Sequence, residues 1–195
     1  MENLKFSWRK CPDGYGIATD KDGASVLRPR SRNFVAVEPL TLHPVLFRQI
    51  ASLDAKPTAY AKFASDFGLL RTVDGDEPIK LWNAERGTFR AGLQFWDAGE
   101  MKAVSDLFNT FSLGNLGITL GDGSLTLEPA NLLDAMWVQF ALSFTKREQH
   151  RRCLWCETWF AYGVHAGDEA AGQALVDPLP AEGALGHDPV APGAR

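Results

Sequence analysis

The segment 129–145 constrains the fold more than any other part of the chain, because its large apolar residues recur every three or four positions. This spacing places them on one face of a helix, and the proline at position 129 suits a first helical turn. The stripe consists of Leu132, Leu133, Met136, Trp137, Phe140, Ala141 and Phe144. We therefore predict a central packing helix here, with Asp134, Gln139 and Ser143 facing away from the core.

Shorter elements are predicted before this helix. Aromatic and β-branched residues, separated by turn sequences, predict a small antiparallel sheet from the segments 5–9, 14–18, 24–28 and 33–39. Helical spacing of apolar residues then appears in the segments 44–53, 57–67, 78–96 and 101–111. Residues 116–127 flank a Gly-Asp-Gly turn, which predicts a β-hairpin.

The end of the chain differs in composition from the rest. Residues 168–195 are rich in alanine, glycine and proline and contain no aromatic residue. Such a segment cannot bury enough apolar surface to offset the entropy lost on ordering, so we predict a disordered tail.

Charge and hydropathy exclude several classes of protein. The net charge is -4, with 20 Lys and Arg against 24 Asp and Glu, which excludes a polybasic, histone-like protein. The chain has no apolar run near the roughly 18 residues of a membrane-spanning helix, and its start is polar. Three cysteines, an odd number, argue against a disulfide framework. We therefore expect a cytoplasmic protein that does not enter the membrane.

The pair Cys153 and Cys156 is the most specific chemical signal, because two thiolates separated by two residues can bind one tetrahedral zinc ion. Zinc in a structural site takes four ligands, and His150 and His165 lie close enough in sequence to complete the set. Two chains that share one zinc ion in a homodimer would complete it with four sulfurs. The alternatives are a pair of free thiols or, less consistent with a pair that follows a helix, a redox-active pair.

The segment 128–163 also carries a family resemblance. The residues on which this resemblance rests are Leu132, Leu133, Trp137, Gln139, Arg151, Cys153, Cys156, Trp159 and Phe160. With these residues the chain resembles bacterial proteins in which an ABATE-like helical domain precedes a CGNR-type zinc-ribbon or treble-clef knuckle, and weaker similarity extends over about residues 34–163. The resemblance implies zinc binding. Those families supply a second pair of ligands after the first, whereas residues 164–195 contain no cysteine, so the second half of the knuckle is missing.

Basic and aromatic residues are mixed around the cysteine pair. The candidate nucleic-acid-binding residues are Lys146, Arg147, Arg151, Arg152, Trp155 and Trp159. Cations can pair with phosphates while rings stack on bases. The alternative is a solvated helix end followed by aromatic residues of the core.

These observations predict a mainly helical α+β protein with an N-terminal antiparallel β-sheet, four to five helices, one internal β-hairpin and a truncated C-terminal knuckle. Its parts are a helical α+β domain at 1–147, a Cys-x-x-Cys knuckle fragment at 148–167 and the tail at 168–195. No motif of a nucleophile with its base, a phosphate loop or a zinc protease is present, so we expect no enzyme.

The expected function is that of a non-enzymatic binding or regulatory protein, with a partial zinc knuckle that contacts nucleic acid or a protein. A metal-free module that binds a protein or a small ligand is the alternative. An enzyme whose site is assembled from distant residues comes third.

Overall fold

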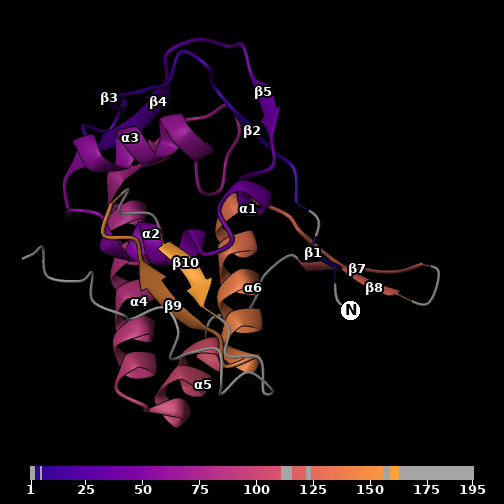
Figure 1. Cartoon of the computed structure of the whole chain (residues 1–195). Helices are drawn as coiled ribbons and strands as arrows, with labels where there is room; N and C mark the ends of the chain where they lie inside the picture. The colour runs from indigo at the N-terminus through magenta and orange to yellow at the C-terminus, as the bar shows by residue number, and fades with distance from the viewer. Residues whose placement is uncertain (1–2, 5, 111–115, 122–123, 156–158, 163–195) are drawn as a thin grey trace, which may run out of the picture. The chain divides into compact units, whose positions relative to one another are not determined.

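The fold is that of a computed structural model, which describes residues 3–4, 6–110, 116–121, 124–155 and 159–162 (Figure 1). Its helices are α1 (Pro39–Leu42), α2 (Leu46–Ser52), α3 (Pro57–Phe67), α4 (Ile79–Asp97), α5 (Met101–Thr110) and α6 (Leu132–Thr145). Its strands are β1 (Asn3–Leu4), β2 (Trp8–Lys10), β3 (Tyr15–Thr19), β4 (Ser25–Pro29), β5 (Val35–Val37), β6 (Glu77–Pro78), β7 (Leu116–Gly121), β8 (Ser124–Pro129), β9 (Gln149–Arg152) and β10 (Trp159–Tyr162). The α+β class is confirmed. The described residues contain the short helix α1 in addition to the five helical segments that the apolar spacing predicts.

The core gathers around α6, as its apolar stripe predicts. The rings of Phe89 and Trp96 on α4 stack on Trp137 and Phe140 of α6, with centroids 4.1 and 5.7 Å apart. The ring of Phe47 on α2 stacks on Phe140 from another direction, at 4.9 Å. Three helices therefore share one aromatic core, whose burial is the main source of their stability.

The prediction that Gln139 and Ser143 face away from the core is wrong, because both side chains are buried. The Gln139 amide donates to the backbone oxygen of His43 at 3.0 Å, and the Ser143 hydroxyl donates to a Glu148 carboxylate oxygen at 2.7 Å. Other segments cover this side of α6 as well. A buried polar group is tolerated there because it has a hydrogen-bond partner.

The N-terminal strands form two small sheets rather than the single sheet predicted. Strand β2 pairs antiparallel with β5, whereas β4 lies between β3 and β6 in a three-stranded antiparallel sheet. Trp8 of β2 lies at the end of α3, where its indole nitrogen donates to the backbone oxygen of Leu69 at 2.9 Å. Gly68, which ends α3, has a φ of 100°, and a Cβ there would lie 2.7 Å from the Trp8 ring. The predicted glycine stop of this helix is thus also a packing requirement.

The predicted hairpin at 116–127 is confirmed as β7 and β8, which pair antiparallel, and β1 adds to β8 in parallel. Proline 129 ends β8 instead of opening the helix. Helix α6 begins at Leu132, where the Asn131 side-chain oxygen accepts from the backbone N–H of Asp134 at 2.9 Å. This asparagine cap satisfies an otherwise unpaired N–H and fixes the helix start three residues later than predicted.

The close approach of α4 to its neighbours leads to a prediction about two glycines of that helix. A Cβ at Gly92 would lie 2.7 Å from Leu107 and 2.9 Å from the Phe140 ring, whereas a Cβ at Gly87 meets nothing within 4 Å. We expect Gly92→Ala to lower the free energy of unfolding by about 1–3 kcal/mol. The matched control Gly87→Ala should raise it by about 0.5–1 kcal/mol, because alanine is the better helix former. Urea unfolding of both variants tests this, and equal effects would contradict the packing of α4.

Residues 1–163 form one compact unit, distinct from 164–195. The predicted knuckle fragment at 148–167 is described only in part, and the predicted disordered tail at 168–195 lies outside the described residues. A helix with the length and apolar character needed to cross a bilayer is not found among the described residues.

Candidate functional site

The Cys-x-x-Cys sequence lies in the connection between two paired strands. Strands β9 and β10 are antiparallel, with Arg152 opposite Trp159 and Gln149 opposite Tyr162, so residues 153–158 close a β-hairpin. Cys153 is a partly exposed free thiol at the end of β9, and Cys156 lies outside the described residues. Between them Leu154 and Trp155 are fully exposed, at 101% and 97%. The hairpin therefore presents a thiol and two large apolar side chains at its tip.

His150, a predicted zinc ligand, lies at the base of the hairpin rather than at its tip. Its side chain is fully buried, and its ring meets the rings of Phe47 and Trp96 edge-on at 5.4 Å. His165, the other predicted histidine ligand, lies outside the described residues. In the part of the chain that the structure describes, no three His, Cys, Asp or Glu side chains lie together in a way that could hold a metal ion.

Arg48 of α2 holds the base of the hairpin, and its side chain is only 7% exposed. The guanidinium lies 5.5 Å from the Trp96 ring of α4 and 5.1 Å from the Trp159 ring of β10. One of its terminal nitrogens, Nη2, donates to Asp97 at 3.1 Å. Contacts of a desolvated cation with two indole rings are each worth about 1–2 kcal/mol, so Arg48 joins α2, α4 and β10.

The burial of His150 determines its charge. Burial, reinforced by the positive charge of Arg48, lowers the pKa of His150 to about 4, although Glu148 and Asp97 act in the opposite direction. The imidazole is therefore neutral at pH 7. A neutral ring has one N–H donor and one acceptor nitrogen, and neither nitrogen has a hydrogen-bond partner among the described residues.

This pKa predicts a loss of stability in acid. Between pH 6.5 and pH 4 the unfolded chain protonates His150 while the folded chain does not, so the free energy of unfolding falls as the pH falls through this range. We expect His150 to account for about 2–3 kcal/mol of that loss. The measurement is urea unfolding of the metal-free protein at pH 4.5 and pH 7, compared with His150→Phe. A loss of the same size in both proteins would show that His150 does not carry it.

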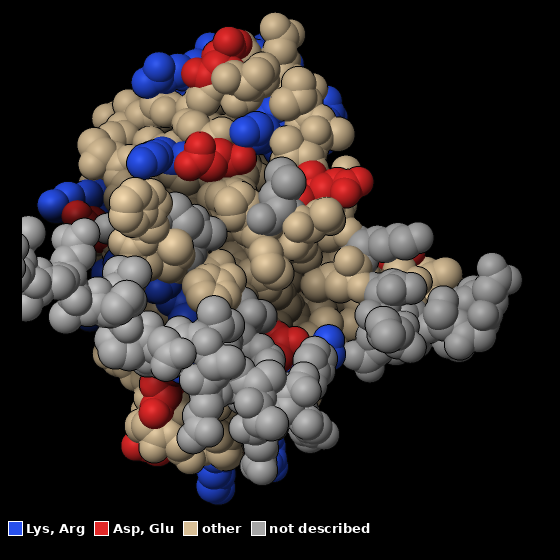
Figure 2. Space-filling model, in the orientation of Figure 1, with Lys and Arg blue, Asp and Glu red and all other residues tan. Residues whose placement is uncertain are grey.

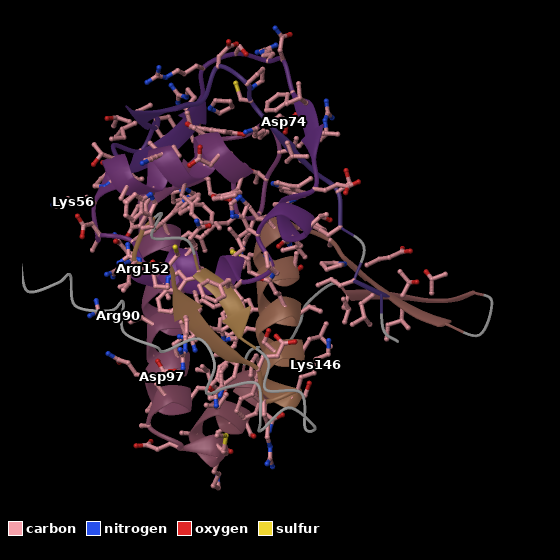
Figure 3. All side chains as sticks on the ribbon, viewed as in Figure 1. Lys56, Asp74, Arg90, Asp97, Lys146 and Arg152 are labelled. Carbon is pink, nitrogen blue, oxygen red and sulfur yellow. The ribbon has the colours of Figure 1, made fainter. Side chains whose placement is uncertain are left out.

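The predicted nucleic-acid-binding residues come from the end of α6, from β9 and the residues that follow it, and from β10. Lys146 follows α6, and Arg147 has a φ of 54°, whereas Arg151 and Arg152 are exposed on β9. Figure 3 shows Lys146 and Arg152 on opposite sides of the hairpin in that view. On the face that Figure 2 shows, blue Lys and Arg side chains are interspersed with red Asp and Glu side chains.

The two tryptophans in this set differ in their surroundings. The Trp159 ring packs against Arg48 at the base of the hairpin, while that of Trp155 is almost completely exposed. Arg151 and Arg152 therefore lie on β9, and the exposed Trp155 lies just after it, at the tip of the hairpin.

Sequence reasoning missed Arg48 and the burial of His150. Arg48 is the third residue of α2, between Phe47 and Gln49, and nothing in that pattern distinguishes it from an exposed cation of an amphipathic helix. Its burial comes from Trp96 of α4 and Trp159 of β10, which are distant in sequence.

Comparisons of the chain with protein-family models, with curated proteins and with solved structures found no match. The resemblance to proteins with an ABATE-like domain and a CGNR-type knuckle therefore stays a prediction.

Proposed function

We propose that this chain is a non-enzymatic binding protein whose β9–β10 hairpin is half of a zinc knuckle, completed by a second copy of the chain. The observation that carries the proposal is the position of the Cys-x-x-Cys sequence, which connects two paired strands and has fully exposed apolar side chains beside Cys153. Each copy supplies the thiolates of Cys153 and Cys156, and two copies supply the four sulfurs of a structural zinc site.

The burial of His150 favours this arrangement over a site within one chain. To ligate zinc beside Cys153, the imidazole would have to move away from Phe47 and Trp96. This movement would create a void beside Arg48. Emptying such a buried aromatic position costs several kcal/mol, on the order of 3–5 for a complete ring. A second pair of thiolates requires no such change.

The exposed apolar tip supports a second copy as the partner. Leu154 and Trp155 together present more apolar surface than a single exposed apolar residue normally does. A twofold axis through the shared zinc would bring these two side chains of one chain against the same two side chains of the other. Zinc removal should therefore separate the two chains while the helical core, which does not include the hairpin tip, stays folded.

Zinc content and mass test the proposal together. For the full chain purified with zinc and a reductant, we expect about 0.5 zinc per chain, because one ion serves two chains, and a dimer by analytical ultracentrifugation. A chelator should convert the dimer to a monomer without loss of the helical circular dichroism signal. Cys153→Ser and Cys156→Ser should each give zinc-free monomers, whereas the control Cys11→Ser, which changes a buried thiol outside the hairpin, should remain a dimer.

Two results would contradict this proposal. One zinc per monomer, with loss of the helical signal on chelation, would indicate a complete site within one chain. A zinc-free protein with the same mass before and after added zinc would leave the cysteine pair as free thiols.

Nucleic acid is the second candidate partner, favoured by the exposed Arg151 and Arg152 on β9 and the exposed Trp155 at the tip of the hairpin. In the proposed dimer each of these residues occurs twice, which doubles the number of cations available to phosphates. If they bind single-stranded DNA, an Arg151→Gln/Arg152→Gln variant should lower the slope of log affinity against log salt concentration by roughly one for each phosphate that no longer pairs with a cation. The control is Lys80→Gln on α4. An unchanged slope would exclude this surface as a phosphate-binding site.

The proposal includes a cytoplasmic location. It is supported by the free thiols of Cys11 and Cys153, since a reducing compartment keeps cysteines available for metal.

A further inference from the structure

A cavity of about 330 Å³ lies between strand β3 and helix α3. The backbone N–H of Tyr15 on β3 donates to the Ser65 hydroxyl of α3 at 3.2 Å, which joins the two elements beside the cavity. Figure 1 shows β3 close to α3 in the upper part of the view. The volume lies at the lower end of the range of small-molecule sites, which is about 300–1,000 Å³.

Two exposed cations from separate elements line this cavity. Arg30 follows β4, and Lys62 lies on α3. Within the described residues, neither side chain makes an ion pair or a hydrogen bond. No Asp or Glu is among the described residues that line the cavity. Its wall therefore carries two positive charges that no carboxylate balances.

Two larger cavities of the described residues differ from it in charge. One lies between α2, α3 and β10, and the other lies at the base of the β9–β10 hairpin. The wall of each contains two carboxylates as well as two Lys or Arg side chains. Charge therefore favours an anion in the cavity beside β3, whereas it favours no ion of either sign in the other two.

Gly16 of β3 keeps this cavity open beside Arg30. It pairs regularly with Arg28 of β4 and its φ is not positive, so the backbone does not require a glycine there. Packing does not require one either, because a Cβ would meet only Nε of Arg30, at 3.9 Å. A glycine inside a strand often marks a place where a ligand approaches the backbone closely. Gly16 thus supplies a second sign of a ligand, independent of the charges.

The polar groups on the wall match a phosphate group. A guanidinium presents a fork of N–H donors to two oxygens, and an ammonium group adds a compact positive charge. The Thr58 hydroxyl, which also lines the cavity and makes no hydrogen bond within the described residues, can donate to a further oxygen. The second pKa of a phosphate monoester is about 6, so above pH 7 its two negative charges balance those of Arg30 and Lys62.

We propose that this cavity binds a small phosphate monoester, with its phosphate oxygens on Arg30, Lys62 and Thr58. A phosphate group alone does not fill the volume, which leaves space for a small organic group. This group lies beside Ile17, an apolar wall residue that is 48% exposed, and is therefore uncharged. The site uses neither zinc nor a residue of the β9–β10 hairpin, so it is independent of the function proposed for that hairpin.

The test is an NMR titration of the metal-free full chain above pH 7, in a buffer without other polyvalent anions. The ligands are phenyl phosphate, glycerol 3-phosphate, phenyl sulfate, benzoate and inorganic phosphate. At least one monoester should bind saturably and shift the amide signals of Gly16, Arg30 and Lys62. Phenyl sulfate and benzoate, which carry one charge, should bind at least tenfold more weakly. Inorganic phosphate, which lacks the organic group, should also bind more weakly.

Three results of this titration would overturn the proposal. The first is no saturable binding by either monoester. The second is binding of phenyl sulfate or benzoate as tight as that of the better monoester, because the site would then not select two negative charges. The third is inorganic phosphate that binds at least as tightly as the monoester, which would make free phosphate the ligand.

Four variants test whether the anion lies in this cavity. Arg30→Gln and Lys62→Gln should each weaken monoester binding at least tenfold. Gly16→Val keeps both cations but places two methyl groups beside Arg30, and it should weaken binding by a similar factor. The control Arg32→Gln removes an exposed cation that does not line the cavity, so it should bind as the native chain does.

Two outcomes with these variants would place the anion elsewhere and overturn the proposal. One is an effect of Arg32→Gln as large as that of Arg30→Gln, which would indicate attraction to the general surface charge. The other is native affinity in a folded Gly16→Val variant. If Gly16→Val does not fold, the comparison of Arg30→Gln with Arg32→Gln decides.

Discussion

Replacement of Phe140 by alanine is expected to lower the free energy of unfolding by about 3–5 kcal/mol, which is comparable to the whole stability of many domains of this size. Phe140 is completely buried, and its ring lies against Phe47 of α2, Trp96 of α4 and Phe108 of α5, at 4.9, 5.7 and 5.0 Å. Its removal leaves a cavity at the point where four helices meet. The loss therefore combines the lost transfer free energy of the ring with the cost of the cavity.

Urea unfolding followed by circular dichroism and by tryptophan fluorescence measures this effect. Phe160→Ala is the control, because that ring is 43% exposed on β10, and its replacement should cost less than about 1 kcal/mol. The comparison is made with a chelator, so that the hairpin tip does not contribute through a second chain. A loss below 1 kcal/mol for Phe140→Ala would place this face of α6 outside the core.

The second large effect is expected at Glu77, a carboxylate that is 1% exposed. Its two oxygens accept from the backbone N–H groups of Leu70 and Arg71, at 2.9 and 2.7 Å. Glu77→Ala leaves the buried N–H of Leu70 and the partly buried N–H of Arg71 without this acceptor. The first costs about 1–3 kcal/mol, and the second costs less because water can reach it. We therefore expect a loss of about 2–5 kcal/mol from these two groups together.

The same unfolding measurement tests Glu77, with Glu100→Ala as the control. Glu100 is exposed beyond the end of α4, and its replacement should change the free energy of unfolding by less than about 0.5 kcal/mol. Crystal or NMR analysis of Glu77→Ala should show the loop at 69–72 displaced. An ordered loop and a loss similar to that of Glu100→Ala would show that these hydrogen bonds do not hold the loop in place.

Elements whose sequence patterns lie within one short segment could be predicted from the sequence alone. The apolar stripe of α6, the glycine that ends α3 and the turn between β7 and β8 are each recognisable within about fifteen residues. Their causes, which are helical periodicity and backbone conformations that favour glycine, operate within a short stretch of chain. The Cys-x-x-Cys pair belongs to this group as a motif, because the spacing of two thiolates is a local property.

Features that depend on contacts between distant segments were decided by the tertiary structure. Gln139 and Ser143 have the polarity of exposed helix residues, yet both are buried because segments before and after α6 supply their hydrogen-bond partners. The pairing of the N-terminal strands is also decided over long distances, because β2 pairs with β5, and β4 pairs with β6, which lies about fifty residues later.

The environment of Arg48 shows the same limit most clearly. Arg48 and His150 are about one hundred residues apart, and neither has a sequence signal for burial. The hairpin of β9 and β10 folds back over α2 and encloses the guanidinium between Trp96 and Trp159. A charge inside such a core is stable only because aromatic faces and Asp97 from separate elements surround it, and that arrangement exists only once the chain has folded.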